Sequence, residues 1–325
     1  MSKSISKYSI SFLLVLLAMQ SPVSAQMVSD SLVQLVSYWS VGDKYEFRNE
    51  QVKALINGND TTVTEKSAAL VTLEVIEETD STYTVRYDSG DYQHSDYLRM
   101  KMVESIDKNI GPMPVDIITN QLGQPQTILP LSWETISDKV INGCVAEVME
   151  RLDGASIDRE QLEQWIRTLI SPAVVQQSVE AEIVKLFQFH GGRYEIGTHY
   201  EYEIAISNMF DPSGDGIPVH GEFWVSRENT NEEMVEFCVY QRADPAILKD
   251  VAVEYLKSTG IDVDNDEVKR SLASISYELS DIMVYRYHLG TGWPLYIASF
   301  RDVLSFKDGE LARHDYTEES FTILL

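Results

Sequence analysis

One segment of the chain has the spacing of a calcium-binding loop. Asp211–Glu222 places side-chain oxygens at positions 1, 3 and 5, a glycine at position 6 and an acid at position 12. In such loops the glycine permits the sharp turn and the last acid supplies two oxygens. The residues on both sides alternate between apolar and polar, which predicts strands, whereas calcium loops of this type lie between helices. We therefore expect a hairpin turn here, and calcium binding stays open.

The other reactive side chains do not form a recognisable catalytic, cofactor or metal site. The acidic run Asp262–Asp266 lacks the glycine and the last acid of a calcium loop, so it predicts a loop that leads into a helix. The six histidines are scattered without zinc-site spacing, although His199 and His220 could approach each other across neighbouring strands. No nucleophile elbow and no glycine-rich phosphate loop is present. The sequence predicts no cofactor.

Cys144 and Cys238 are the only cysteines in the chain. In an oxidising compartment they could form a disulfide that stabilises the fold by about 4–5 kcal/mol. Two separate thiols are the alternative, and spacing along the sequence does not decide between them.

Residues 1–25 have the organisation of a cleavable signal peptide. Lys3 and Lys7 give a positive start, and the almost wholly apolar segment Ile10–Met19 is too short to span a bilayer. Small residues precede Gln26, where we expect cleavage. The pattern predicts an exported protein, periplasmic or extracellular.

The composition restricts the partners of the mature chain. Cleavage removes two lysines and no acid, which leaves 24 basic against 51 acidic side chains. A negative field of this size repels phosphate backbones, so we expect no nucleic-acid partner. After residue 25 no apolar run is long enough for a transmembrane helix. An apolar small molecule or another envelope protein is the expected partner.

Apolar residues alternate with polar ones in several short segments of the first half. Tyr45 and Phe47, then Val71–Val75, then Tyr83–Tyr87 each follow this period of two, with turn residues between them. The pattern predicts an antiparallel meander with one buried face.

The second half echoes the first. Val41–Phe47 resembles Ile196–Tyr202, and the strands near residues 71–87 match residues 223–239 at a constant offset of 152. A third echo joins Gly123 and Gly292, each followed two residues later by proline. Three echoes in the same order indicate an ancient duplication.

Helical patterns separate and interrupt the predicted strands. Asp158 begins a helix whose apolar stripe is Leu162, Trp165, Ile166 and Leu169, and Pro172 begins another that ends before Gly191. Residues 132–152 are also predicted to be helical. Later in the chain, Asp244 and Pro245 begin a helix that stops at Gly260, and residues 274–325 return to strands with a hairpin at Asp308-Gly309.

These elements predict an α+β fold in which a large, curved antiparallel sheet packs over a central group of helices. We expect one domain, residues 26–325, in which the half-repeats 38–130 and 193–325 flank a helical segment, 132–190. The sheet could be one layer or two duplicated half-sheets.

The segments Val41–Glu46 and Gly292–Leu295 resemble those of uncharacterised exported proteins of bacterial envelopes. A curved sheet around helices is also similar, at the level of fold, to periplasmic lipoprotein carriers. The resemblance implies an envelope location and carries over no ligand residue.

The leading functional hypothesis is non-catalytic binding of an apolar ligand or a polypeptide. The helix stripe at Leu162–Leu169 would form one wall of a groove and the aromatic residues of the second half the other; ordinary core packing is the alternative. A hydrolase with a site that the sequence does not reveal, and a purely structural protein, are the other hypotheses. The aromatic residues concerned are Phe223, Trp224, Phe237, Tyr285, Tyr287, Trp293, Tyr296 and Phe300.

Overall fold

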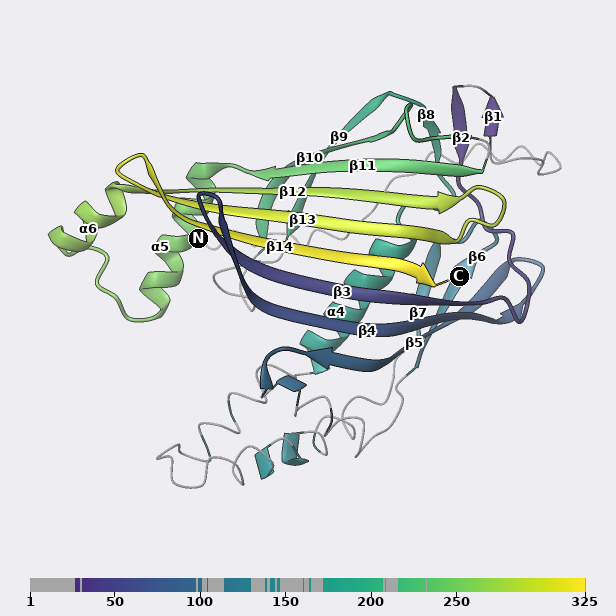
Figure 1. The fold of residues 1–325 in the computed structure, drawn as a ribbon, viewed down its shortest axis with the longest axis horizontal. Helices are drawn as coiled ribbons and strands as arrows, with labels where there is room; N and C mark the ends of the chain where they lie inside the picture. The colour runs from purple at the N-terminus through teal and green to yellow at the C-terminus, as the bar shows by residue number, and fades with distance from the viewer. Residues whose placement is uncertain are drawn as a thin grey trace, which may run out of the picture.

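The computed structural model describes most of the chain after residue 26, and its strands dominate the molecule (Figure 1). The described residues are 27–29, 31–97, 99–100, 104, 114–129, 138, 141–143, 145–146, 160, 164, 172–206, 208, 216–231 and 233–324. The strands are β1 (Met27–Ser29), β2 (Leu32–Gln34), β3 (Lys44–Asn57), β4 (Asp60–Glu78), β5 (Thr82–His94), β6 (Val115–Asn120), β7 (Pro125–Ile128), β8 (Arg193–Glu195), β9 (His199–Ile206), β10 (Ile217–Val225), β11 (Met234–Ala243), β12 (Ile275–His288), β13 (Pro294–Lys307) and β14 (Glu310–Leu324). The helices are α4 (Pro172–Phe187), α5 (Pro245–Ser258) and α6 (Asp266–Ala273).

Eleven of these strands form one antiparallel sheet in the order β7-β6-β5-β4-β3-β14-β13-β12-β11-β10-β9. The sheet is open, with β7 and β9 at its two edges. A second sheet, β1-β2-β8, has three strands. The large antiparallel sheet matches the predicted fold class in coarse form. Over the described residues the fold is nevertheless mostly β, with sheet strands of up to 19 residues, and α4 is the helix of the predicted central group that lies within them.

Local sequence signals placed several element boundaries correctly. The helix α4 begins at Pro172, and α5 begins after Asp244, whose carboxylate accepts a hydrogen bond from the Ala246 N–H at 2.7 Å. The acidic run 262–266 leads into α6, and Asn265 caps that helix. The hairpin at Asp308-Gly309 joins β13 to β14. The predicted helices at 132–152 and 158–170, and the signal peptide, fall outside the described residues except for 138, 141–143, 145–146, 160 and 164. Among the described helices, none has the length and apolar character that crossing a bilayer requires.

The large sheet contains two five-strand meanders, β3–β7 and β9–β13, and β14 pairs with β13 on one side and β3 on the other. Gly42 and Gly197 precede the two meanders with positive φ angles of 93° and 80°. Their N–H groups donate to Val75 at 2.8 Å and Val225 at 3.0 Å. Two residues are equivalent when they occupy the same place in the strand pairings of the two meanders. That the meanders descend from one duplicated ancestor remains a proposal.

The strand pairing corrects one part of the sequence alignment between the halves. Leu73 pairs with Tyr45 and Tyr87, and Phe223 pairs with Tyr200 and Val239, so Leu73 is equivalent to Phe223. The offset between β4 and β10 is therefore 150 rather than the predicted 152, because the chain between the paired residues Phe223 and Val239 is two residues longer than the chain between Leu73 and Tyr87. The offset of 152 holds for β5 and β11. Both meanders also have a register shift before their last strand, at Ile118/Thr119 and at Arg286/Tyr287.

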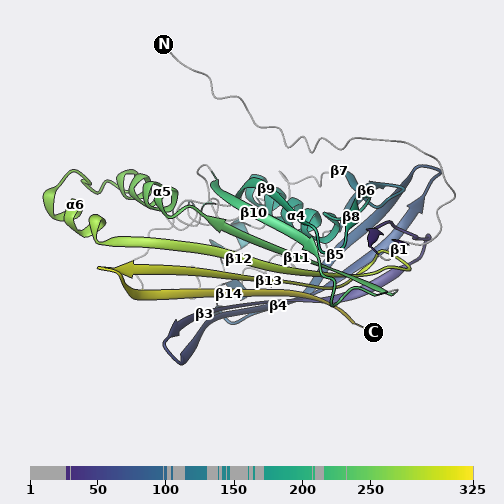
Figure 2. The same cartoon turned by 90° about the horizontal axis from the view of Figure 1, so that it is seen from above.

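Side chains alternate between two faces of the large sheet, and α4 and α5 lie on the same face (Figure 2). This covered face holds a main core in which Ile183 and Leu186 of α4 pack with strand residues such as Phe47 and Phe237. A smaller core lies under α5, around its Leu248. The opposite face is called the open face, and Figure 1 shows β14 and β3 passing in front of α4 when that face is viewed.

The contact between α4 and the sheet also includes ionisable groups. The Asn49 side chain of β3 donates to Glu182 at 2.8 Å, and Lys185 pairs with Glu319 of β14 at 2.7 Å. Burial, together with the nearby Glu319 carboxylate, raises the pKa of Glu182 to about 7. Glu182 is therefore largely protonated in mildly acidic solution and about half ionised at neutral pH.

Candidate binding face

On the open face of the first meander, charged side chains of alternating sign cross four strands. Lys44 pairs with Glu74 at 3.9 Å, and the Arg86 guanidinium donates two hydrogen bonds to Asp116, at 2.8 and 2.9 Å. The strand register places these four residues directly beside one another. This charge ladder is typical of a sheet surface that faces water, since opposite charges on neighbouring strands stabilise each other. The ladder is Lys44, Glu74, Arg86 and Asp116.

The equivalent row of the second meander is almost entirely uncharged. The imidazole of His199 stacks on Trp224 with ring centroids 4.7 Å apart. Cys238 is a free thiol, and burial, with the nearby Glu236, raises its pKa to about 11, so it is neutral at pH 7. Val284 stands where the first meander has Asp116. The row consists of His199, Trp224, Cys238 and Val284.

A second apolar row lies beside this one. Tyr240, Ile282 and Phe300 are direct neighbours on β11, β12 and β13. Ile282 is 47% exposed, and Tyr240 and Phe300 are partly exposed. Together the two rows give an apolar strip on the open face of the second meander. The apolar strip is Trp224, Cys238, Tyr240, Ile282, Val284 and Phe300.

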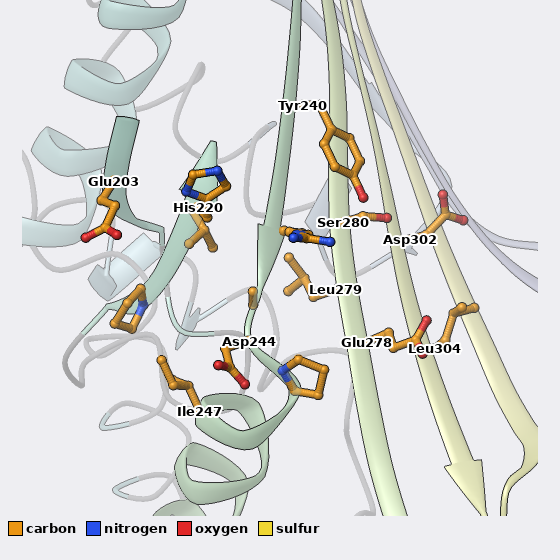
Figure 3. A pocket seen from close by; sticks show the side chains of 15 residues that line it. Glu203, His220, Tyr240, Asp244, Ile247, Glu278, Leu279, Ser280, Asp302 and Leu304 are labelled. Atoms are coloured by element: carbon orange, nitrogen blue, oxygen red, sulfur yellow. The ribbon is translucent and has the colours of Figure 1, made fainter. Parts of the chain in front are cut away.

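Next to the apolar strip, towards α5, the open face contains a basin of about 770 Å³ (Figure 3). Most of its lining side chains project from the open face, and Tyr240 belongs to both the strip and the basin. Pro245 and Ile247, in the first turn of α5, line it at one end. Its walls therefore mix apolar side chains with charged ones.

The charged side chains of the basin form a row across the strands. His220 lies directly opposite Arg242, with Glu203 on its other side on β9. The equivalent residues of the first meander are Leu70, Gly90 and Arg48, which pair with one another in the same way. Because that meander forms with Leu70 and Gly90, the fold does not require His220 or Arg242. These two side chains are additions particular to the second meander.

The geometry does not support a hydrolytic site in the basin. Ser280 and His220 are both present, yet the register places Arg242 between them. Two strand spacings of about 4.8 Å separate the serine and histidine backbones by about 10 Å, and the Arg242 side chain stands between them. Asp302 accepts a hydrogen bond from His314 on β14 rather than from a basin histidine. Over the described residues, no three potential metal ligands gather in one place.

The candidates from the sequence are the calcium-like loop, the histidine pair and the two cysteines. The turn residues Asp211–Asp215 of the calcium-like loop lie outside the described residues, while its flanks are the paired strands β9 and β10, as predicted. Glu222 lies in β10 and contacts the His199 ring at 3.1 Å. His199 and His220 do not meet, because four positions of the register separate them. Cys144 lies outside the described residues.

The aromatic residues of the second half divide between the two faces. Phe237, Tyr285, Tyr287 and Trp293 are buried in the main core, where Phe223 packs against them, so core packing explains these five. Trp224, Tyr296 and Phe300 lie on the open face instead. The predicted groove wall Leu162–Leu169 falls outside the described residues except for Gln164. Sequence reasoning thus found the aromatic residues but did not separate the two sets.

Comparison with known proteins gives only remote similarity. No family model matches the chain, and no curated protein matches its sequence. A structure of lipovitellin, described for its lipid–protein interactions, is 7% identical with a TM-score of 0.39; the match covers 88% of this chain and 25% of that one. OmpT, an outer membrane protein of Vibrio cholerae, is 7% identical with a TM-score of 0.21, over 88% of this chain and all of that one. The chain thus spans about a quarter of the lipovitellin chain, and at these scores neither similarity bears on function.

Proposed function

We propose that this is an exported protein that binds a ligand, without catalysis, on the open face of its second meander. The observation that carries this proposal is the replacement of the charge ladder by the apolar strip at equivalent positions. An exposed sheet face is expected to carry paired charges or polar residues, as the first meander does, and a contiguous apolar area on such a face is typical of a binding surface. The signal-peptide pattern of residues 1–25 supports export.

The strip and the basin favour an open binding surface over an enclosed carrier cavity. The aromatic residues of the covered face fill the main core, so the ligand would contact the partly exposed side chains Tyr240, Ile282 and Phe300. Covering an isoleucine that is half exposed contributes about 1 kcal/mol, and several such side chains together supply the affinity. The basin then accommodates the polar part of the ligand.

The test is binding of the neutral lipophilic dye Nile red, followed by fluorescence. We expect Ile282→Asp to weaken binding about tenfold or more, since it places a charge in the apolar strip. Val63→Asp is the matched control, because Val63 is a 52% exposed strand residue of the first half. Both variants should keep the melting temperature of the wild type within a few degrees. Equal binding by the two variants would contradict the proposal.

A further inference from the structure

We infer that the ligand of the open face is a cationic, amphipathic segment of a polypeptide. Its apolar side chains would lie on the apolar strip and its lysine or arginine side chains would reach the carboxylates that border it. This inference rests on the proposed function and specifies its partner. Three observations support it: the length of the row through the apolar strip, the carboxylates without a partner, and the comparison between the meanders.

The first argument is the length of the surface. The row through the apolar strip begins at Glu201 on β9 and ends at Glu318 on β14, so it crosses six strands. Five spacings of about 4.8 Å make it about 24 Å long. An extended polypeptide of about seven residues spans this distance. A compact small molecule would cover only part of it.

The second argument is the charge at the ends of that row. Glu201 and Glu222 lie directly opposite each other on β9 and β10, where like charges destabilise a sheet. The equivalent pair in the first meander is Glu46 and Thr72, so the meander itself does not require two acids there. His199 contacts Glu222, yet the described residues give Glu201 no ion pair or hydrogen bond through its carboxylate. A cation from a partner would relieve the repulsion between the two carboxylates.

The basin adds further carboxylates of the same kind. Glu203 and Glu278 are exposed, and within the described part of the chain neither carboxylate forms a hydrogen bond or ion pair. The Arg242 guanidinium likewise has no carboxylate partner among the described residues. Its N–H donors suit the backbone carbonyl oxygens of a bound polypeptide, which a simple amphiphile lacks. The formal net charge of −25 also steers cationic partners towards the protein.

The experiment compares two labelled twelve-residue peptides by fluorescence anisotropy. Both have the same leucines, and the alternating polar positions are lysine in one peptide and glutamate in the other. We expect the lysine peptide to bind the wild type at least about tenfold more tightly, with a preference that shrinks as salt is raised. The variant Glu201→Gln/Glu203→Gln/Glu278→Gln should lose most of this preference. The control Glu46→Gln/Glu50→Gln/Glu78→Gln removes the same charge from the first half and should keep it.

Each outcome separates this inference from the proposed function. If both peptides bind equally and Ile282→Asp weakens both, the cationic partner is wrong while the binding face stands. If neither peptide binds but Nile red binding still depends on Ile282, the ligand is not a polypeptide. If the lysine peptide binds both triple variants and Ile282→Asp as well as the wild type, attraction to the overall acidic chain explains it, and the cationic partner is again rejected. In that last case the proposed function is tested by the Nile red binding experiment alone.

Discussion

The two meanders share their strand order and their turns but present different chemistry on the open face. In the first, Arg86 and Asp116 belong to a charge ladder, while the equivalent residues in the second are Cys238 and Val284. On the covered face both meanders contribute apolar residues to one core. The fold therefore constrains the covered face in both halves and leaves the open face free to differ. For this reason the first meander acts as an internal control for the second.

The largest effect on binding is expected when the open-face row of one meander is replaced by the equivalent row of the other. The triple variant Trp224→Glu/Cys238→Arg/Val284→Asp installs the charges of the first meander at the equivalent positions of the second. Because the first meander forms with this ladder, we expect the variant to fold with a melting temperature close to that of the wild type. Binding of Nile red should fall by about a hundredfold or more, since three side chains of the apolar strip become charged.

The reverse exchange, Glu74→Trp/Arg86→Cys/Asp116→Val, completes this test. It creates a second apolar row, so the number of Nile red molecules bound per chain should rise. Unchanged binding in both exchange variants would show that the apolar strip is not the binding surface.

A smaller effect is expected on the covered face, where the meanders also differ. Asn49 donates to Glu182, and the equivalent residue of the second meander is Ile204. The folded-state pKa of Glu182, about 7, lies above its ordinary value of 4.5. The protonated carboxyl is favoured in the folded state, so stability is greatest below about pH 4.5 and falls as pH rises towards 7. The loss is about 2 kcal/mol, reduced from the full linkage value because Glu182 is partly exposed.

Urea unfolding at about pH 5 and about pH 8 measures this loss. Glu182→Gln should be less sensitive to pH than the wild type by about 2 kcal/mol, because its amide does not ionise. Glu254→Gln, at an exposed glutamate of α5 that pairs with Lys257, is measured alongside as the control. The assignment is wrong if the free energy of unfolding of the wild type increases from about pH 5 to about pH 8 by more than that of Glu182→Gln does.

The smallest effect on stability is expected for an ion pair of the second meander whose equivalent residues in the first meander are uncharged. Glu236 is buried and accepts a hydrogen bond from Arg286 at 2.7 Å, while the equivalent neighbours in the first meander are Thr84 and Ile118. Glu236→Thr alone should cost about 1–2 kcal/mol, because it leaves the partly exposed Arg286 without its carboxylate. The double variant Glu236→Thr/Arg286→Ile copies the first meander and should cost less than the single variant. A double-mutant cycle by chemical unfolding provides the comparison.

Much of the fold could be predicted from local patterns. Helix starts at Pro172 and Asp244 depend on the chemistry of one turn, and period-two alternation in Tyr45–Phe47 or Tyr83–Tyr87 is a property of single strands. The position of β14 between the meanders could not be predicted in this way, because it depends on pairing with β3 from the other end of the described chain.

The candidate site was hidden for a related reason. Alternation shows that a strand has two faces, but the packing of α4 and α5 decides which face is covered. The comparison that reveals the apolar strip needs the correct equivalence, in which Trp224 corresponds to Glu74 at an offset of 150. With an offset of 152, Trp224 aligns with the neutral Thr72, and the contrast disappears. The signal was present in the sequence, and the two additional residues in the β10–β11 hairpin obscured it.

The central place of β14 has a consequence for how the chain folds. Within the sheet the two meanders are joined by the pairing of this strand, which pairs with β13 and β3 and is synthesised after both. Until β14 is in place, β3 has an unpaired edge, and such edges promote aggregation. Contacts between residues so far apart in sequence also slow folding. A chain in which both meanders have formed but β14 has not yet joined them exposes this edge, and that is the state in which aggregation is most expected.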